Sequence, residues 1–172
     1  MTQATKVKIV TGKVRFSYAN VFAPKASVEG GTPKYSVSII IPKTDKETIA
    51  KITKAFEDTK AGAAAYFGGA VPKGLKGGLR DGDEEKDDAA YAGSYFINAN
   101  SAQKPGVVDA DLNPIMDMNE FYSGCYGRAS ITFYPYNAQG SKGIACGLNN
   151  VQKLEDGEKL GGSTSAAADF AI

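Results

Sequence analysis

Hydrophobic and polar positions alternate along the first forty residues of the chain. Within residues 6–22, β-branched and aromatic side chains recur at a spacing of two, opposite Lys13, Arg15 and Ser17. This spacing is typical of a strand with one buried face, and we expect a bend at Gly12. The same alternation returns over residues 34–41 and is stopped by a proline. The pattern therefore predicts two strands. The apolar side of the first would hold Val10, Val14, Phe16 and Tyr18.

The spacing then becomes helical. Thr44 or Asp45 is suited to cap a helix, and apolar side chains recur three or four positions apart from Lys46 to about Tyr66. This pattern predicts one amphipathic helix. Residues 68–93 are rich in glycine and charge and have no apolar periodicity, so we expect a flexible acidic insertion on the surface.

Strand-like alternation resumes in the second half. Residues 94–101 predict a short strand with Phe96 and Asn98 on its polar side, and residues 106–118 predict a strand interrupted by a turn at 111–114. Residues 126–137 and 143–153 flank a turn that contains glycine, which predicts a β-hairpin. From about residue 156 the chain is rich in Gly, Ser and Ala, as flexible tails are.

These elements predict a mainly β protein. A barrel of five or six strands, with one main α-helix after the second strand and a long loop insertion, fits better than a sandwich, whose strands recur at regular intervals along the whole chain. We expect one domain over residues 1–155 and a tail over 156–172. A chain of 172 residues buries enough surface to fold without disulfides or metals.

The composition excludes several classes of function. The chain has no histidine, which excludes Ser-His-Asp and Cys-His catalysis, and its two cysteines are too few for a zinc site. We expect both thiols to be reduced, and we expect no catalytic residue, metal or cofactor. The N-terminus lacks the apolar segment of a signal peptide, and no stretch approaches the roughly 20 apolar residues of a membrane span. These features predict a cytoplasmic protein with no membrane partner.

Charge is sorted along the chain, although the formal net charge is only +1. Residues 1–80 hold 14 Lys and Arg against 5 Asp and Glu, whereas residues 81–120 hold 2 against 10. The basic excess makes a polyanion a candidate partner. The acidic run at 81–88 is either a solvated loop or a movable segment that shields the basic surface.

The polar face of residues 126–137 carries one arginine, three tyrosines and hydroxyl groups. Proteins that hold single-stranded nucleic acid stack aromatic rings on bases and track phosphates with cations. The polar sides of the other strands add basic and aromatic groups. The candidate binding residues are Lys13, Arg15, Lys34, Phe96, Tyr126, Arg128, Tyr134 and Tyr136. Tyrosines on a half-exposed strand also serve as cross-strand packing partners, so a structural role for this face stays open.

Two other motifs fail on their spacing. The glycine-rich segment at 68–78 resembles a phosphate loop, but Leu75 stands where that motif requires lysine. Asp109 begins a run like a calcium loop, but Pro114 occupies the position that requires glycine. The carboxylates of residues 109–120 are candidate Mg²⁺ ligands of a nuclease only if they converge.

Four segments carry a resemblance to a known family: GKVRFSYANVFAP at 12–24, PKYSVSIIIPK at 33–43, FYSGCYGRASITFYPY at 121–136 and GIACGLNNVQK at 143–153. Over residues 8–155 the chain resembles the bacteriophage single-stranded DNA-binding proteins with an OB fold. The resemblance implies a barrel that coats single-stranded DNA in the bacterial host cell during phage DNA replication or recombination. It implies neither base specificity nor catalysis. The residue types that match the expected groove are those of Arg15, Tyr126, Arg128, Tyr134 and Tyr136.

The C-terminus departs from the family pattern. Such proteins usually end in a strongly acidic tail with a terminal aromatic residue, which recruits replication or recombination proteins and competes with DNA. Here Phe170 follows a single acid, Asp169. Either the tail is degenerate, or the acidic run at 81–88 or the acids at 155–158 take over that competition.

The sequence thus predicts a non-enzymatic single-stranded DNA-binding protein, and it does not indicate the oligomeric state. Two alternatives stay open. One is a structural or adaptor β-module of the phage particle that binds a protein through its tyrosine face, since Tyr and Arg are also enriched at protein interfaces. The other is the metal-dependent nuclease.

Overall fold

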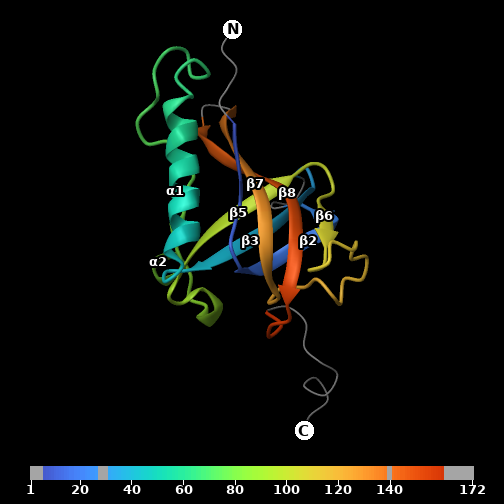
Figure 1. Ribbon diagram of the computed structural model, residues 1–172. Helices are drawn as coiled ribbons and strands as arrows, with labels where there is room; N and C mark the ends of the chain where they lie inside the picture. Colours follow the sequence, from blue (N-terminus) through green and yellow to red (C-terminus); the bar gives the residue numbers. More distant parts are fainter. Residues whose placement is uncertain (1–5, 27–30, 139–140, 161–172) are drawn as a thin grey trace.

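The computed structural model of the chain describes residues 6–26, 31–138 and 141–160 (Figure 1). Its elements follow in the order β1 (Val7–Val10), β2 (Val14–Lys25), β3 (Lys34–Pro42), α1 (Lys46–Ala61), β4 (Arg80–Asp81), α2 (Gly82–Glu85), the 3-10 turn η1 (Ala89–Tyr91), β5 (Ser94–Ser101), β6 (Gly106–Val108), β7 (Tyr126–Ala138) and β8 (Ser141–Glu155).

Five strands close into a barrel. β2 pairs with β3, and β3 pairs with β5, both antiparallel. β5 then pairs in parallel with β8, β8 pairs with β7, and β7 returns to β2. The short strands β1, β4 and β6 extend this sheet, which has eight strands within the described residues. Helix α1 follows β3 and lies along the outside of the barrel (Figure 1). The predicted mainly β barrel with one main helix after its second strand is confirmed, with five strands in the closed ring.

The predicted first strand is in fact two strands. β1 pairs with β7, whereas β2 pairs mainly with β3, and Gly12 lies between them. The Gly12 N–H donates a hydrogen bond to Thr48 Oγ1 at 3.1 Å. A Cβ at Gly12 would lie 2.8 Å from that oxygen, so a larger residue would push the helix away from this corner.

A β-bulge interrupts the alternation of β2 after Ser17. The register shifts between Ser17 and Asn20, and Tyr18 has a φ of 48°. As a result Tyr18 is 60% exposed. Ser17 stays on the outer face, opposite Ser38, as alternation predicted, and it is buried there beside the Tyr91 hydroxyl. Placing Tyr18 on the apolar side was therefore wrong, and so was placing Val10, which is 39% exposed on β1. Val14 and Phe16 lie in the core as predicted.

Helix α1 begins as predicted and ends earlier. The Asp45 carboxylate accepts the N–H of Thr48, which is the hydrogen bond of an N-cap. The helix packs Ile52 and Ala55 into the barrel core. It ends at Gly62, whose N–H donates to carbonyls of the last turn, and residues beyond it form turns. No helix of the described residues is long and apolar enough to cross a membrane.

The insertion at 68–93 contains β4, α2 and η1, none of which the sequence predicted. Tyr91 is fully buried in a second apolar cluster with Ile40 and Phe96, on the outer face of β3 and β5. Its hydroxyl donates to Ser38 Oγ at 2.9 Å, and its ring meets the Phe96 ring edge-on at 5.1 Å. This cluster attaches the insertion to the barrel.

The segments around the predicted turn and tail are also ordered by hydrogen bonds. The Asp109 carboxylate accepts the N–H groups of Asp111 and Asn113, which forms the predicted turn. The predicted tail starts beyond β8, where the Leu160 N–H donates to the carbonyl of Ser123 at 2.9 Å. The remainder of that tail, residues 161–172, lies outside the described residues.

Candidate nucleic-acid interface

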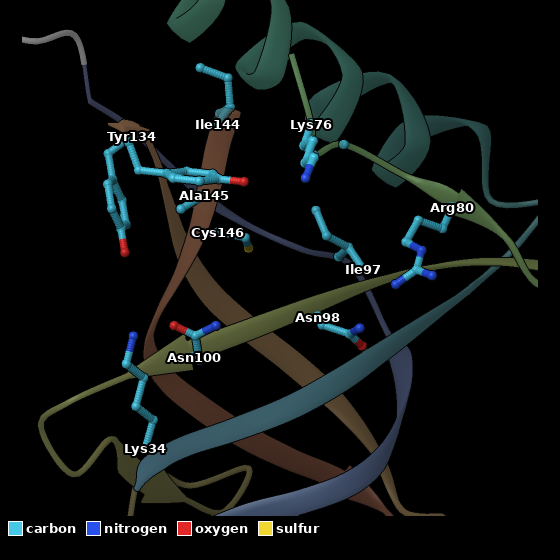
Figure 2. Close-up of a pocket in the computed structure, with 13 residues that line it drawn as sticks. Lys34, Lys76, Arg80, Ile97, Asn98, Asn100, Tyr134, Ile144, Ala145 and Cys146 are labelled. Atoms are coloured by element: carbon cyan, nitrogen blue, oxygen red, sulfur yellow. The ribbon is translucent and has the colours of Figure 1, made fainter. Parts of the chain in front are cut away.

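An open groove crosses the outside of the barrel over β5, β7 and β8 (Figure 2). Its polar and aromatic lining comes from four parts of the chain. These are Lys34 of β3, Asn98 and Asn100 of β5, Tyr134 and Tyr136 of β7, and Lys76 and Arg80 of the insertion. We call this set of residues the strand groove.

The two tyrosines of the strand groove lie over glycines of the neighbouring strand. In the hairpin register Tyr136 is opposite Gly143, and Tyr134 is two pairs along, opposite Ala145. A Cβ at Gly143 would lie 2.7 Å from the Tyr136 hydroxyl, and one at Gly147 would lie 3.2 Å from the Tyr134 ring. The missing side chains on β8 therefore make room for the rings on the outer face.

The glycine-rich part of the insertion forms one wall of the strand groove. We call residues 75–79 the strap. The Lys76 carbonyl accepts the N–H of Ile144 at 2.9 Å, which pairs the strap with β8. Gly77 has a φ of +119°, and a Cβ there would lie 2.3 Å from the Ile144 carbonyl oxygen. Only glycine allows this close approach, and the approach sets the Lys76 ammonium at the groove wall.

Positive charge stands at both ends of the strand groove. Lys34 lies at one end, and Lys76 and Arg80 lie at the other (Figure 2). Arg80 is already engaged, because its Nε and Nη2 donate to Glu85 Oε1 at 2.9 and 2.6 Å. This ion pair raises the pKa of Arg80 and lowers the pKa of Glu85. The carboxylate of α2 thus neutralises part of the charge at this end.

The strand groove continues into a second hollow toward β1. The two share Lys34, Asn100 and Tyr134, and the second adds Lys6 and Asn149. The Asn149 amide donates to Thr132 Oγ1 at 2.8 Å, which fixes the amide on the outer face. Lys6 brings one more cation to this end of the path.

Three of the predicted residues gather elsewhere. Lys13, Arg15 and Tyr126 line a separate hollow beside η1. The Lys13 Nζ and the Arg15 guanidinium carbon lie 5.5 and 5.3 Å from the centre of the Tyr126 ring. Arg15 donates to the carbonyls of Gly124 and Glu158, and Lys13 pairs with the carboxylate of Glu155. Their charged groups therefore tie β2 to the end of β8.

The other two predicted residues also lie apart from the strand groove. Arg128 is exposed on β7, and its Nε donates to the carbonyl of Thr11 at 3.0 Å. Phe96 is fully buried against Tyr91, with the Arg80 guanidinium 5.0 Å above its ring. A base has no access to Phe96 in this structure, so we leave it out of the interface proposed below.

Lys34, Tyr134 and Tyr136 are thus the predicted residues that the structure brings together. Sequence interpretation missed Asn100, Lys76 and Arg80 as members of the same surface. The alternation of β5 already put the asparagines on the polar face, which was a usable signal. Lys76 and Arg80 had none, because their position depends on the pairing between the strap and β8.

The carboxylates proposed for a nuclease do not form a metal site. The Asp109 carboxylate accepts hydrogen bonds from backbone N–H groups of its own turn. No group of three or more Asp, Glu or Cys side chains among the described residues is placed to hold a metal ion.

Comparison with known proteins decides the family. The family model described as the Enterobacter phage Enc34 single-stranded DNA-binding protein matches residues 7–172. The chain belongs to this family. A curated relative, putative protein p50 of Acyrthosiphon pisum secondary endosymbiont phage 1, is 28% identical in an alignment that covers 95% of this chain and 92% of the relative. The family resemblance inferred from the sequence is confirmed.

Solved structures agree with this membership. The single-stranded DNA-binding protein of bacteriophage Enc34 in complex with single-stranded DNA matches with a TM-score of 0.73 and 26% identity, over 90% of this chain and 89% of that chain. The single-stranded DNA-binding protein encoded by bacteriophage T7 matches with a TM-score of 0.65 over 98% of this chain and 96% of that chain. At 17% identity, the second match shows the shared fold.

Proposed function

We propose that this protein binds single-stranded DNA without sequence preference and coats and protects it during phage DNA replication or recombination. The observation that carries the proposal is the strand groove, where two tyrosine rings and three cations line one continuous path over the barrel. Membership of the Enc34 family, and the DNA complex of its namesake, support the same function.

The chemistry of the strand groove suits a nucleic-acid strand of any sequence. Rings stack on the faces of bases, which every base offers, and cations follow the phosphates. A tyrosine hydroxyl is already protonated at neutral pH and does not repel phosphate, and burial raises the pKa of Tyr134 further. The Asn98 and Asn100 amides add hydrogen-bonding groups to the groove. In Figure 2 Asn100 lies between Tyr134 and Lys34, and Asn98 lies toward Arg80.

We further propose that the protein has no catalytic role and acts in the cytoplasm of the infected bacterium. The absence of histidine from the sequence and the lack of a metal-binding cluster in the described part of the chain support this. A role of the C-terminal tail in recruiting replication or recombination proteins is also a proposal, and residues 161–172 of that tail lie outside the described residues.

The first prediction tests the strand groove with Tyr134→Ala and Lys34→Ala. Loss of one stacked base costs about 1–3 kcal/mol, so Tyr134→Ala should weaken binding roughly 5- to 150-fold. Lys34→Ala should also weaken binding and should lower the log–log salt slope by about 0.7, the value for one phosphate contact on a single strand. Fluorescence anisotropy of a labelled oligo(dT), at several salt concentrations, measures both effects.

The matched control is Lys51→Ala, which removes an exposed lysine of α1 outside the strand groove. Its effect on affinity should be small. If the unaltered protein did not bind oligo(dT) at ~50 mM salt, where phosphate contacts are strongest, the proposed function would be wrong. A salt-tolerant complex with a protein, indifferent to added oligonucleotide, would favour the adaptor alternative, and Mg²⁺-dependent degradation of the oligonucleotide would favour the nuclease.

A further inference from the structure

Tyr18 is an aromatic side chain that the barrel leaves in solvent. It belongs to β2 and is 60% exposed, although the residues before and after it in that strand are buried or half-buried. Its φ of 48° is unusual for a residue with a side chain. Backbone strain of this kind persists only where the surroundings hold it in place.

Hydrogen bonds hold this bulge on both sides. The Asn20 amide donates to the Tyr18 carbonyl at 3.1 Å and to Ser36 Oγ at 3.2 Å. The Ala19 N–H donates to Ser123 Oγ at 3.0 Å. With the bulge fixed in this way, the Tyr18 ring cannot turn into the core, where regular alternation would have put it.

The ring lies on the outer face of the barrel. Lys86 Nζ is 5.5 Å from the centre of the Tyr18 ring and 5.4 Å from that of Phe96, a residue of the outer side of β5. The same ammonium is 5.3 Å from the ring of Tyr91, which covers Ser38 on that side. Tyr18 therefore stands beside the second apolar cluster, on the side of the sheet that also carries Asn98 and Asn100.

A row of small polar side chains connects Tyr18 with the strand groove. Asn20 is opposite Ser36 in the register of β2 and β3, and Ser36 is opposite Asn100 in the register of β3 and β5. Asn100 is part of the groove floor. From β5 to β2 is a distance of two strand spacings, roughly 10 Å. No bulky side chain stands in this row to block a strand that crosses it.

We propose that Tyr18 is a second base-stacking platform, which extends the path of single-stranded DNA from the strand groove across β3 to β2. The proposal rests on the proposed function. A base stacks on the exposed face of the ring, and the Lys86 ammonium beside the ring is in reach of the adjoining phosphate. Asp87 and Asp88, which follow Lys86, are exposed and bring negative charge to this border, so the platform works mainly by stacking.

The experiment measures affinity against oligonucleotide length. Tyr18→Asn removes the ring and keeps a residue that tolerates positive φ, so the bulge is retained. Oligo(dT) of about 4 and about 16 nucleotides spans the usual range of site sizes for one OB fold. The short strand fills the strand groove, and the long strand reaches Tyr18. We expect Tyr18→Asn to weaken binding of the long strand roughly 5- to 150-fold and to leave the short strand unchanged.

Two variants serve as controls. Tyr134→Ala should weaken binding of both lengths, because it acts inside the strand groove. Tyr66→Ala removes another exposed tyrosine, beyond the end of α1, and should change neither. Unchanged binding of the long strand by Tyr18→Asn, with the Tyr134→Ala effect present, overturns the platform and leaves the proposed function standing. Equal weakening of both lengths by Tyr18→Asn also overturns it. Absence of binding by the unaltered protein overturns the proposed function itself.

Discussion

Burial changes the acidity of one residue that lines the groove, Cys146. The residue lies on β8 beneath the tyrosines and is 6% exposed. Burial raises the pKa of its thiol to about 12, because the interior disfavours the thiolate. Cys125 is buried too, and burial also raises the pKa of that thiol. Neither residue forms a disulfide in this structure.

The raised pKa predicts that the thiols react slowly and that the stability of the protein depends on pH. At pH 8 both thiols should react with Ellman's reagent far more slowly in the folded protein than in urea, since the thiolate is the nucleophile. Below about pH 8.5 the Cys146 thiol is protonated in both the folded and the unfolded protein, so it does not change the free energy of unfolding with pH. As the pH rises from there toward 12 the unfolded protein loses this proton more readily than the folded one, and stability falls.

Urea midpoints measured from pH 7 to 10 test this dependence. Stability should fall over the upper part of that range in the unaltered protein, and the fall should be smaller in Cys146→Ala. Rapid reaction of both thiols in the folded protein at pH 8 would contradict the prediction.

Tyr18 and Phe96 each differ in exposure from what strand alternation predicted, and each difference has one structural cause. Alternation put Tyr18 inside, but a bulge held by hydrogen bonds of Asn20 and Ser123 leaves its ring outside. Alternation put Ser17 outside correctly, and Tyr91 from the insertion buries it there. Alternation put Phe96 outside correctly, but Tyr91 from the insertion covers it. Ser123 and Tyr91 come from segments that are distant in sequence from these strands, so no period within the strand reveals their contacts.

Among the elements, helix α1 depends on a cap that the sequence already identified. Asp45→Ala removes the acceptor for the Thr48 N–H and should lower the free energy of unfolding by about 1 kcal/mol, the usual cost of losing an N-cap. Asp45→Asn keeps an acceptor and should be close to neutral. Urea denaturation followed by circular dichroism measures both variants.

The same pair of variants separates stability from binding. The helix packs on β1, β7 and the core, and Asp45 is outside the strand groove. Affinity of Asp45→Ala for oligo(dT) should therefore match that of the unaltered protein under conditions where both are folded. A large loss of affinity with unchanged stability would show that the cap has another role.

Elements with their own periodicity were predictable, and elements held by partners were not. β5 has the bounds that alternation gave it, and β7 and β8 pair antiparallel as the strands of the predicted hairpin. α2 has four residues and is attached to the barrel through Lys43, whose ammonium lies 2.9 Å from a carboxylate oxygen of Asp81 and of Asp83. A helix that short draws its stability from such contacts rather than from its sequence.

For the molecule as a whole, the structure shows which cations pair with the acidic run at 81–88. Asp81 and Asp83 pair with Lys43, and Glu85 pairs with Arg80 at the end of the strand groove. Each of these carboxylates has a lowered pKa, so the pairs persist to acidic pH and break as the pH falls below the ordinary range of Asp and Glu. At neutral pH this part of the acidic run is therefore held in ion pairs with Lys43 and Arg80.

The corresponding prediction is that Glu85→Gln raises affinity for single-stranded DNA. The change releases Arg80 for a phosphate while removing little stability, because the pair is exposed. A rise of up to about fivefold is expected, the range for one exposed ion pair, with a steeper salt dependence in anisotropy titrations.

Glu57→Gln makes the same change of net charge on α1 and is the matched control. Equal effects of the two variants would show that overall charge, rather than the Arg80 pair, is responsible. Deleting residues 81–88 is a poorer test, because it also removes Gly82, which is buried so closely against η1 that a Cβ there would lie 2.4 Å from the Tyr91 carbonyl oxygen.

The barrel closes through the parallel contact of β5 with β8, where Asn100 is paired with Gly147. These residues are distant in sequence, and contacts of that kind must first overcome the entropy of closing a long loop. The strand groove lies across this seam, with Asn98 and Asn100 on one side and Tyr134, seated over Gly147, on the other. A DNA strand bound in the groove would therefore act as a non-covalent staple across the seam: the surface that it contacts exists only in the closed barrel, so its binding stabilises the closed state.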